Sequence, residues 1–192
     1  MSEWADPGSE QWKNHPWSRV FKERTTFASS FCVGGKVLDA CCGSGWSTEK
    51  ISEVAESVIG IDVSSKAIQL ATEKYSAENI TYMVMNALAM NFENDIFDTV
   101  VSLEAIEHFD KAQVEQYLKE ISKVLKKGGI LVGSTPRAKT VLHKVWYIRQ
   151  NKYHKVIYNK KTLTRLLVRY FSEVNVIEKH NDNYLLFHCK KL

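Results

Sequence analysis

Val37-Leu38-Asp39-Ala40-Cys41-Cys42-Gly43-Ser44-Gly45 is the most informative stretch of this 192-residue chain. It begins with a short apolar run, which predicts a buried strand over 36–40. Two glycines follow, separated by one residue. Glycine lets the backbone turn tightly and come close to a ligand, because it has no Cβ atom. The stretch therefore predicts a strand that ends in a ligand-binding turn.

Further strands follow at intervals, with helical patterns between most of them. The expected strands are 57–63, 79–85, 97–103, 130–134, 173–178 and 184–189. Alternating strands and helices favour a parallel sheet, and the last two strands form a hairpin around the turn-forming Asn181-Asp182-Asn183. We expect an α/β fold, a doubly wound, mainly parallel seven-stranded sheet with a C-terminal antiparallel hairpin strand.

Two of the helices have recognisable end signals. Asp110 and Gln113 form a capping-box pattern that opens one helix, and Gly128-Gly129 is expected to end it. Asn159 is expected to cap a later helix.

The domain organisation follows from these elements. Residues 1–35 carry several aromatic side chains among charged ones and are expected to form an N-terminal helical cap. A single domain is expected over 36–192, with a basic insertion over 136–158. Apolar positions in the insertion predict a helix that packs on its own domain or lies on a membrane surface.

The composition is that of an ordinary globular domain, with 44% hydrophobic and 25% charged residues. No apolar run is long enough to span a bilayer, and the start of the sequence lacks the pattern of a signal peptide. The four cysteines have no metal-binding spacing, so reduced thiols in a cytoplasmic protein are expected.

The charges are distributed unevenly along the chain. Thirteen Lys and Arg residues, and no acidic residue, fall between Glu120 and Glu173, although the net charge of the whole chain is only +4. Such a one-sign stretch attracts anions if its side chains share a face. If they scatter over several faces, they form only a solvated surface.

An acidic residue, Asp62, ends the second expected strand. In open α/β sheets, ligands bind beyond the carboxyl ends of the strands, and a carboxylate there can accept both hydroxyl protons of a ribose. A nicotinamide-binding domain would place a third glycine at position 48, where this chain has Thr48. The missing glycine disfavours that alternative.

At these residues the chain resembles the class I S-adenosylmethionine-dependent methyltransferases, over about residues 36–190. Their first motif reads hydrophobic-Leu-Asp-x-Gly-Cys-Gly-x-Gly, and this chain differs by Cys41 at the first glycine. By this resemblance, Asp39 orders the loop or the methionine amine of the cofactor. Gly43 and Gly45 would admit the methionine end, which Leu103 would approach through its backbone.

The resemblance also implies contacts with the ribose and the adenine. Asp62 would hold the ribose, and Val63 would pack on the adenine. The family has an acidic residue after the third strand that binds the adenine amino group. Here Asn86 and Ala87 stand at that place, so an amide replaces the carboxylate.

A second motif, Glu104-Ala105-Ile106-Glu107-His108, follows the fourth strand, where an acceptor must arrive. His108 is a candidate general base, and Glu104 is a candidate to orient His108 or the acceptor. The motif resembles that of small-RNA 2′-O-methyltransferases and ubiquinone-pathway O-methyltransferases, which use a divalent cation. By that resemblance, His154 or His143 would complete a metal site.

The sequence therefore predicts an enzyme that transfers a methyl group from S-adenosylmethionine to a hydroxyl of a small or lipid-linked, anionic acceptor. It resembles most the ubiquinone-pathway and sugar-methylating O-methyltransferases. Two alternatives stay open: an RNA 2′-O-methyltransferase, and a non-catalytic methyltransferase-like subunit that activates a partner. A divalent cation and a membrane surface are further options.

Overall fold

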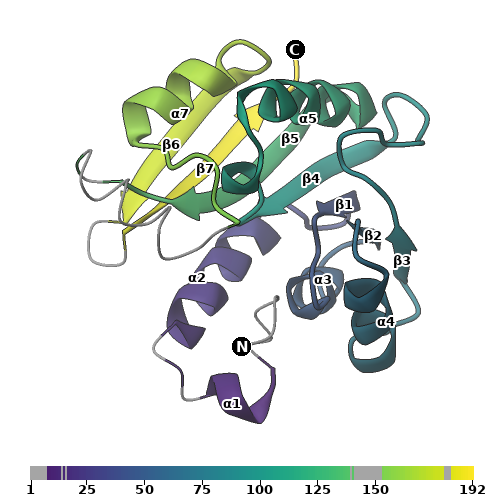
Figure 1. Cartoon of the computed structure of the whole chain (residues 1–192). Coiled ribbons are helices and arrows are strands. Elements are labelled where there is room, and N and C mark those ends of the chain that lie inside the picture. Colours follow the sequence, from purple (N-terminus) through teal and green to yellow (C-terminus); the bar gives the residue numbers. More distant parts are fainter. Residues whose placement is uncertain (1–7, 14, 16, 139, 141–152, 180–182) are drawn as a thin grey trace.

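The computed structural model describes residues 8–13, 15, 17–138, 140, 153–179 and 183–192. It contains one sheet with helices on both of its faces (Figure 1). The strands are β1 Lys36–Ala40, β2 Ser57–Asp62, β3 Ile80–Val84, β4 Phe97–Leu103, β5 Leu125–Pro136, β6 Ser172–Lys179 and β7 Tyr184–Lys190.

The strand order is β3-β2-β1-β4-β5-β7-β6. Strands β1 to β5 pair in parallel, whereas β7 runs antiparallel to both β5 and β6. The order of the strands reverses between β1 and β4, and in such sheets this point opens a crevice for ligands at the carboxyl ends. The expected mainly parallel, seven-stranded sheet with an antiparallel hairpin strand is confirmed.

The helices cover the two faces in separate groups (Figure 1). Helices α2 (Ser18–Ser29), α3 (Trp46–Ser52) and α4 (Ser65–Lys74) lie on one face. Helices α5 (Lys111–Val124) and α7 (Lys160–Leu167) lie on the other. Hydrophobic cores fill the space between the sheet and both groups of helices. None of the helices in the described part of the chain has the length and apolar character that a membrane span needs.

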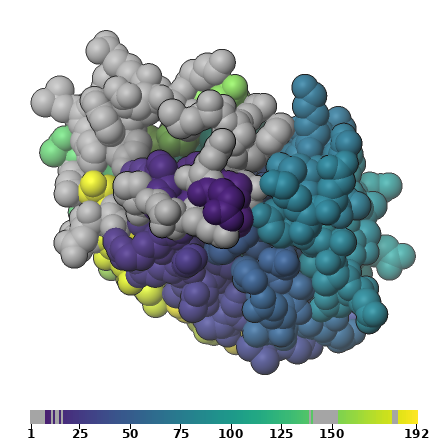
Figure 2. All heavy atoms as spheres, turned by 90° about the horizontal axis from the view of Figure 1, so that it is seen from below, coloured from purple at the N-terminus to yellow at the C-terminus, as the bar shows by residue number. Residues whose placement is uncertain are grey.

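The N-terminal helices lie on the same face of the sheet as α3 and α4, and they reach the C-terminal strands (Figure 1). Figure 2 looks onto this face, with α2 in purple between the yellow C-terminal strands and the blue region of α3 and α4. The short α1 (Glu10–Lys13) precedes α2. Val20 of α2 packs with Tyr184 and Leu186 of β7. The N-terminal segment therefore contacts the C-terminal hairpin directly.

The end of α5 differs from the sequence expectation. The helix stops before Leu125, so Gly128 and Gly129 lie within β5 and do not end the helix. Leu125 is fully buried and pairs with Phe97 of β4, and this burial favours an earlier start of the strand. The helix expected within the basic insertion falls on residues 139 and 141–152, which lie outside the described residues.

The turn after β1 has an unusual backbone. Cys41, Gly43 and Gly45 have positive φ angles of 68°, 54° and 86°. A Cβ atom on Gly45 would lie 2.6 Å from Ala71 Cβ and 3.0 Å from Ala71 Cα. Gly45 therefore permits both the turn and the close approach of α4.

Gly45→Ala is expected to lower the free energy of unfolding by about 2 kcal/mol or more, because it adds backbone strain and overpacking. Gly34→Ala is the matched control: Gly34 also has a positive φ, 67°, but nothing lies within 4 Å of a Cβ built there. Strain alone predicts a loss of about 1 kcal/mol at Gly34. Urea denaturation measures both losses, and equal losses would contradict a packing role for Gly45.

Candidate active site

One pocket of about 600 Å³ opens at the carboxyl ends of β1, β2 and β4. Gly45 is not among the lining residues, and its place is in the packing of α3 against α4. The lining includes the other residues that the sequence singled out: Asp39, Gly43, Asp62, Val63, Asn86, Ala87, Leu103, Glu104 and His108.

Asp39 is a buried carboxylate at the end of β1, with only 1% of its surface exposed. Its Oδ2 accepts hydrogen bonds from Thr48 Oγ1 at 2.7 Å and Ser47 Oγ at 3.2 Å, both from α3. Burial raises the pKa of Asp39 to about 6, and the two hydrogen bonds act in the opposite direction. Thr48 stands where a nicotinamide-binding motif would have its third glycine. Its hydroxyl group instead holds the Asp39 carboxylate at the pocket.

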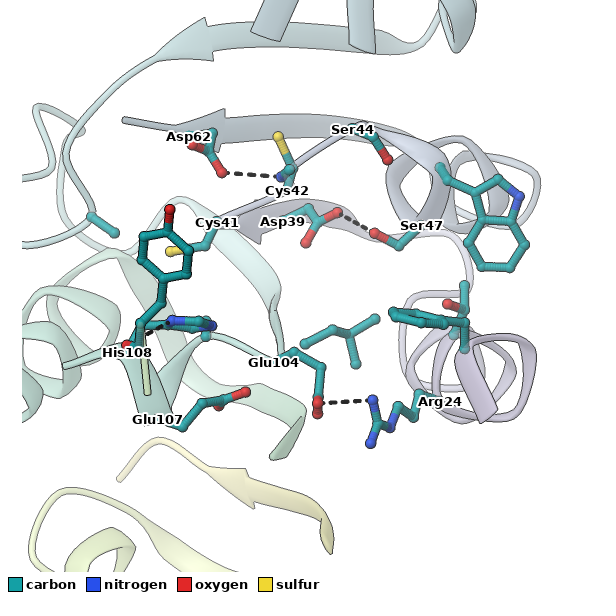
Figure 3. Close-up of a pocket in the computed structure, with 18 of the residues that line it drawn as sticks. Arg24, Asp39, Cys41, Cys42, Ser44, Ser47, Asp62, Glu104, Glu107 and His108 are labelled. Atoms are coloured by element: carbon teal, nitrogen blue, oxygen red, sulfur yellow. Dashed lines mark hydrogen bonds and ion pairs between the residues drawn. The ribbon is translucent and has the colours of Figure 1, made fainter. Parts of the chain in front are cut away.

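Asp62 is fixed by two backbone N–H groups. Its Oδ2 accepts from Gly43 N at 3.1 Å, and its Oδ1 accepts from Ser64 N at 2.9 Å. Figure 3 shows the Asp62 carboxylate beside the glycine turn, across the cavity from Glu104 and Arg24. Because a carboxylate oxygen can accept more than one hydrogen bond, Asp62 keeps capacity for a ligand.

The segment after β3 forms one edge of the pocket. Asn86 Oδ1 accepts a hydrogen bond from Leu88 N at 2.9 Å, which fixes the direction of the amide. Val63, Met85 and Ala87 add apolar surface to the same lining. This edge therefore combines an oriented amide with an apolar surface, as a flat heterocycle requires.

Within the described part of the chain, the Glu104 carboxylate bonds to Arg24 and Ser134 and not to His108. Its Oε2 lies 2.8 Å from Arg24 Nη1 of α2, and its Oε1 accepts from Ser134 Oγ at 2.8 Å. Figure 3 shows the Glu104 carboxylate pointing toward Arg24. Of the two roles expected for Glu104, orienting His108 through its carboxylate has no support in this geometry.

His108 lies in the short helix η1 (Ile106–His108), directly after the turn at Glu104. Its Nδ1 is 3.2 Å from the carbonyl oxygen of Tyr153. A carbonyl can only accept, so Nδ1 carries the proton and Nε2 is the basic atom. Burial lowers the pKa of His108, while the Tyr153 carbonyl acts to raise it. The lowered pKa favours the neutral form of the imidazole.

Glu107 and His154 lie next to His108. The ligand atoms of these three residues all lie within 4.8 Å of one another. Glu107 is fully buried, its Oε2 accepts from Thr135 Oγ1 at 2.9 Å, and its Oε1 has no hydrogen-bond partner among the described residues. Burial, together with the charge of Glu104, raises the pKa of Glu107 well above its ordinary value. Burial also lowers the pKa of His154, to about 4.

Sequence reasoning did not assign some residues of the pocket. The N-terminal helices contribute Arg24, Thr25 and an aromatic wall of Trp12, Trp17 and Phe21. The Trp12 and Phe21 rings meet edge to face, 5.5 Å apart. The cluster of aromatic residues near the start of the sequence was the only sequence feature that pointed to this wall. No local sequence pattern distinguishes Arg24 from the other basic residues of the N-terminal segment.

The basic residues between Lys123 and Arg169 that the structure describes lie outside the pocket lining. Several pair with acidic side chains of other segments, such as Lys126 with Asp98 and Arg169 with Glu115. Four others (Lys139, Lys144, Arg149 and Lys152) lie outside the described residues.

The sheet order, the glycine turn after β1 and the acidic residue that ends β2 define a class I S-adenosylmethionine-dependent methyltransferase domain. Residues 37–129, slightly less than half of the chain, match the family model for a methyltransferase domain.

Curated relatives match a similar part of the chain. A probable S-adenosylmethionine-dependent methyltransferase of Mycolicibacterium smegmatis is 33% identical over 106 residues, which are 55% of this chain and 39% of that protein. A ubiquinone biosynthesis O-methyltransferase of Rhizobium johnstonii is 32% identical over 104 residues, which are 53% of this chain and 41% of that protein. The matches therefore span less than half the length of these relatives.

A solved structure shares the fold over nearly the whole chain. The N-methyltransferase NodS from Bradyrhizobium japonicum, in complex with S-adenosyl-L-homocysteine, superposes with a TM-score of 0.76 at 20% identity. The superposition covers 97% of this chain and 93% of that one. This likeness concerns the fold.

Proposed function

We propose that this chain transfers a methyl group from S-adenosylmethionine to a hydroxyl of a small, neutral aromatic acceptor. The observation that carries the proposal is the joint placement, in one pocket, of two strand-end carboxylates and the His108 imidazole. Figure 3 shows these three side chains around one cavity; in the proposal, Asp39 and Asp62 hold the cofactor and His108 acts on the acceptor.

The cofactor side fits S-adenosylmethionine group by group. The buried Asp39 carboxylate suits the cationic methionine amine, and Asp62 suits the two ribose hydroxyls. Asn86 and the apolar Val63 and Ala87 suit the adenine. When bound there, the cofactor supplies a methyl group on a positively charged sulfur.

His108 supplies the complementary chemistry. A hydroxyl oxygen forms a bond to the methyl carbon as the carbon–sulfur bond breaks, and the hydroxyl proton passes to Nε2 of His108. The products are a methyl ether and a neutral thioether. The hydrogen bond to the Tyr153 carbonyl places the proton of the neutral ring on Nδ1, so Nε2 is the atom that accepts the hydroxyl proton.

The charges of the acceptor side support a neutral acceptor. Arg24 is compensated by Glu104, while burial favours neutral Glu107 and neutral His108. The described basic residues of the 123–169 stretch do not reach this space. The aromatic wall of Trp12, Trp17 and Phe21 supplies flat apolar surface, which suits an aromatic ring.

Cofactor affinity is expected to fall by about tenfold as the pH decreases from about 8 to about 5. The pKa of Asp39 is about 6, so its charge is present above that pH and is lost below it. The cationic amine of the cofactor binds the charged form. Calorimetry across this range measures the change. Asp39→Asn should bind weakly at every pH, and an identical pH dependence in this variant would contradict the assignment.

A divalent cation is a second candidate feature of the same site. Glu107, His108 and His154 offer one carboxylate oxygen and two imidazole nitrogens, a donor set that suits transition metals. The orphan Glu107 Oε1 is the specific observation that favours an ion. A bound ion would lower the pKa of an acceptor hydroxyl.

The proposal is tested against its alternatives with cell extract. Tritiated-methyl S-adenosylmethionine and the purified chain are added, and the extract is separated into lipid, small-molecule and RNA pools. We expect label in alkali-stable form in the small-molecule pool. Label in RNA alone would support the RNA 2′-O-methyltransferase, and cofactor binding with no label in any pool would support a non-catalytic subunit.

A further inference from the structure

Arg24 is a buried cation that the N-terminal helix α2 brings to the pocket. Only 5% of its side chain is exposed, and Nη1 lies 2.8 Å from Glu104 Oε2. Its guanidinium also lies over the ring of Tyr184, 4.4 Å from the ring centroid. One residue of α2 therefore contacts both the motif after β4 and the C-terminal hairpin.

Glu104 is held in a backbone conformation that residues with a Cβ atom rarely adopt. Its φ angle is +52°, and its N–H donates to the Ser134 carbonyl at 3.0 Å. Both carboxylate oxygens are also bound, one by Ser134 Oγ and the other by Arg24. Such a conformation persists only where its surroundings fix it.

The residues that follow this strained turn carry the chemistry of the site. The helix η1 begins at Ile106, and its Glu107 and His108 line the pocket. The direction of η1 depends on the backbone of Glu104, because only Ala105 separates the two. A contact that fixes Glu104 therefore also fixes the position of His108.

Stability alone is a weak reason for such an ion pair. Removing two charges from water is costly, and apolar side chains of similar volume often serve a folded core as well or better. In addition, Arg24 Nε is buried and has no hydrogen-bond partner in the part of the chain that the structure describes. A contact that served only to hold α2 against the turn after β4 would not need a buried ion pair.

We propose that Arg24 is a positioning residue for methyl transfer: through Glu104 it fixes the turn that places His108 at the acceptor. This inference rests on the function proposed above. Arg24 acts through Glu104 and does not itself touch the reacting atoms. It also makes the N-terminal helical segment part of the catalytic apparatus.

The experiment compares Arg24→Met with Arg19→Met, a matched control on the exposed side of the same helix. The probe is 4-methylcatechol with tritiated-methyl S-adenosylmethionine. In Arg24→Met we expect kcat to fall by about tenfold or more, because a misplacement of about 1 Å costs up to about a hundredfold. Cofactor Kd should change by less than about twofold, and Arg19→Met should match the wild type in both. Arg24→Lys, which keeps the charge, should recover part of the lost kcat.

Hydrogen exchange gives a readout that needs no activity. The peptide 103–109 contains the Glu104 N–H, which is bonded to Ser134, and the His108 N–H, which is bonded to Ala105. In Arg24→Met this peptide should exchange faster, and Arg24→Lys should be intermediate. Strands β2 and β3, at the opposite end of the sheet from β7, should be unaffected. If Arg24→Met does not fold, Arg24→Lys and the reversed pair Arg24→Glu with Glu104→Arg carry the test.

Unchanged exchange and unchanged kcat in a folded Arg24 variant would overturn the proposal. So would a loss of kcat that is equal in Arg24→Met and Arg19→Met. If the wild type transfers no methyl group, the proposed function fails, while hydrogen exchange still decides whether Arg24 fixes the turn.

Discussion

Replacing His108 by alanine is expected to lower turnover by about a hundredfold or more, while cofactor affinity stays close to that of the wild type. This result is expected because the proposal gives His108 the acceptor proton, whereas Asp39 and Asp62 hold the cofactor; all three side chains line the pocket of Figure 3. Initial rates with labelled cofactor measure the first effect, and calorimetry with S-adenosyl-L-homocysteine measures the second.

Chelation separates the two roles that the geometry allows for His108. If the imidazole is a base, activity is insensitive to chelator and His154→Ala has a small effect. If Glu107, His108 and His154 hold a divalent cation, chelator abolishes activity and added metal restores it. Near-normal turnover of His108→Ala would instead assign Glu104, Glu107 and His108 a structural role.

Replacing Asp62 by alanine is expected to weaken cofactor binding by roughly tenfold to a hundredfold, because loss of charge-assisted hydrogen bonds costs about 1.5–3 kcal/mol. The fold should survive the change, because Asp62 lies at a strand end and its bonds to Gly43 N and Ser64 N are local. Calorimetry on the folded variant gives the affinity.

Asp98→Ala is the matched control for Asp62→Ala. Asp98 also accepts a backbone N–H, from Lys36 at 2.9 Å, and also lies on the sheet, but it is outside the pocket. Its loss should leave cofactor affinity unchanged. Equal affinity of the Asp62 variant and the wild type would remove Asp62 from the cofactor site.

Much of the sheet was predictable from local sequence. A strand that is buried on both faces reads as a continuous apolar run, and β4 has the predicted bounds, Phe97–Leu103. The placement of Asp39 and Asp62 in one pocket also followed from sequence, because parallel strands bring their carboxyl ends to the same edge. The strand order of a parallel α/β sheet was therefore enough to predict that Asp39 and Asp62 lie close together.

The acceptor side was less predictable, because it depends on contacts between distant segments. The Arg24–Glu104 pair joins α2 to the turn after β4, and no spacing rule links such positions. The basic stretch shows the same difficulty. Its acidic partners, such as Asp98 for Lys126, come from other elements, so a stretch of sequence with only basic charges lies on a surface that carries both signs of charge. Only the packed structure shows which charges compensate each other.

The most direct measurement of the proposed activity uses the purified chain, tritiated-methyl S-adenosylmethionine and 4-methylcatechol. We predict a labelled methyl ether and S-adenosyl-L-homocysteine in equal amounts, with both products lost together in His108→Ala. Tight cofactor binding without transfer to 4-methylcatechol, to catechol or to any small hydroxyl compound of the extract would contradict the proposal that this pocket methylates a neutral aromatic hydroxyl.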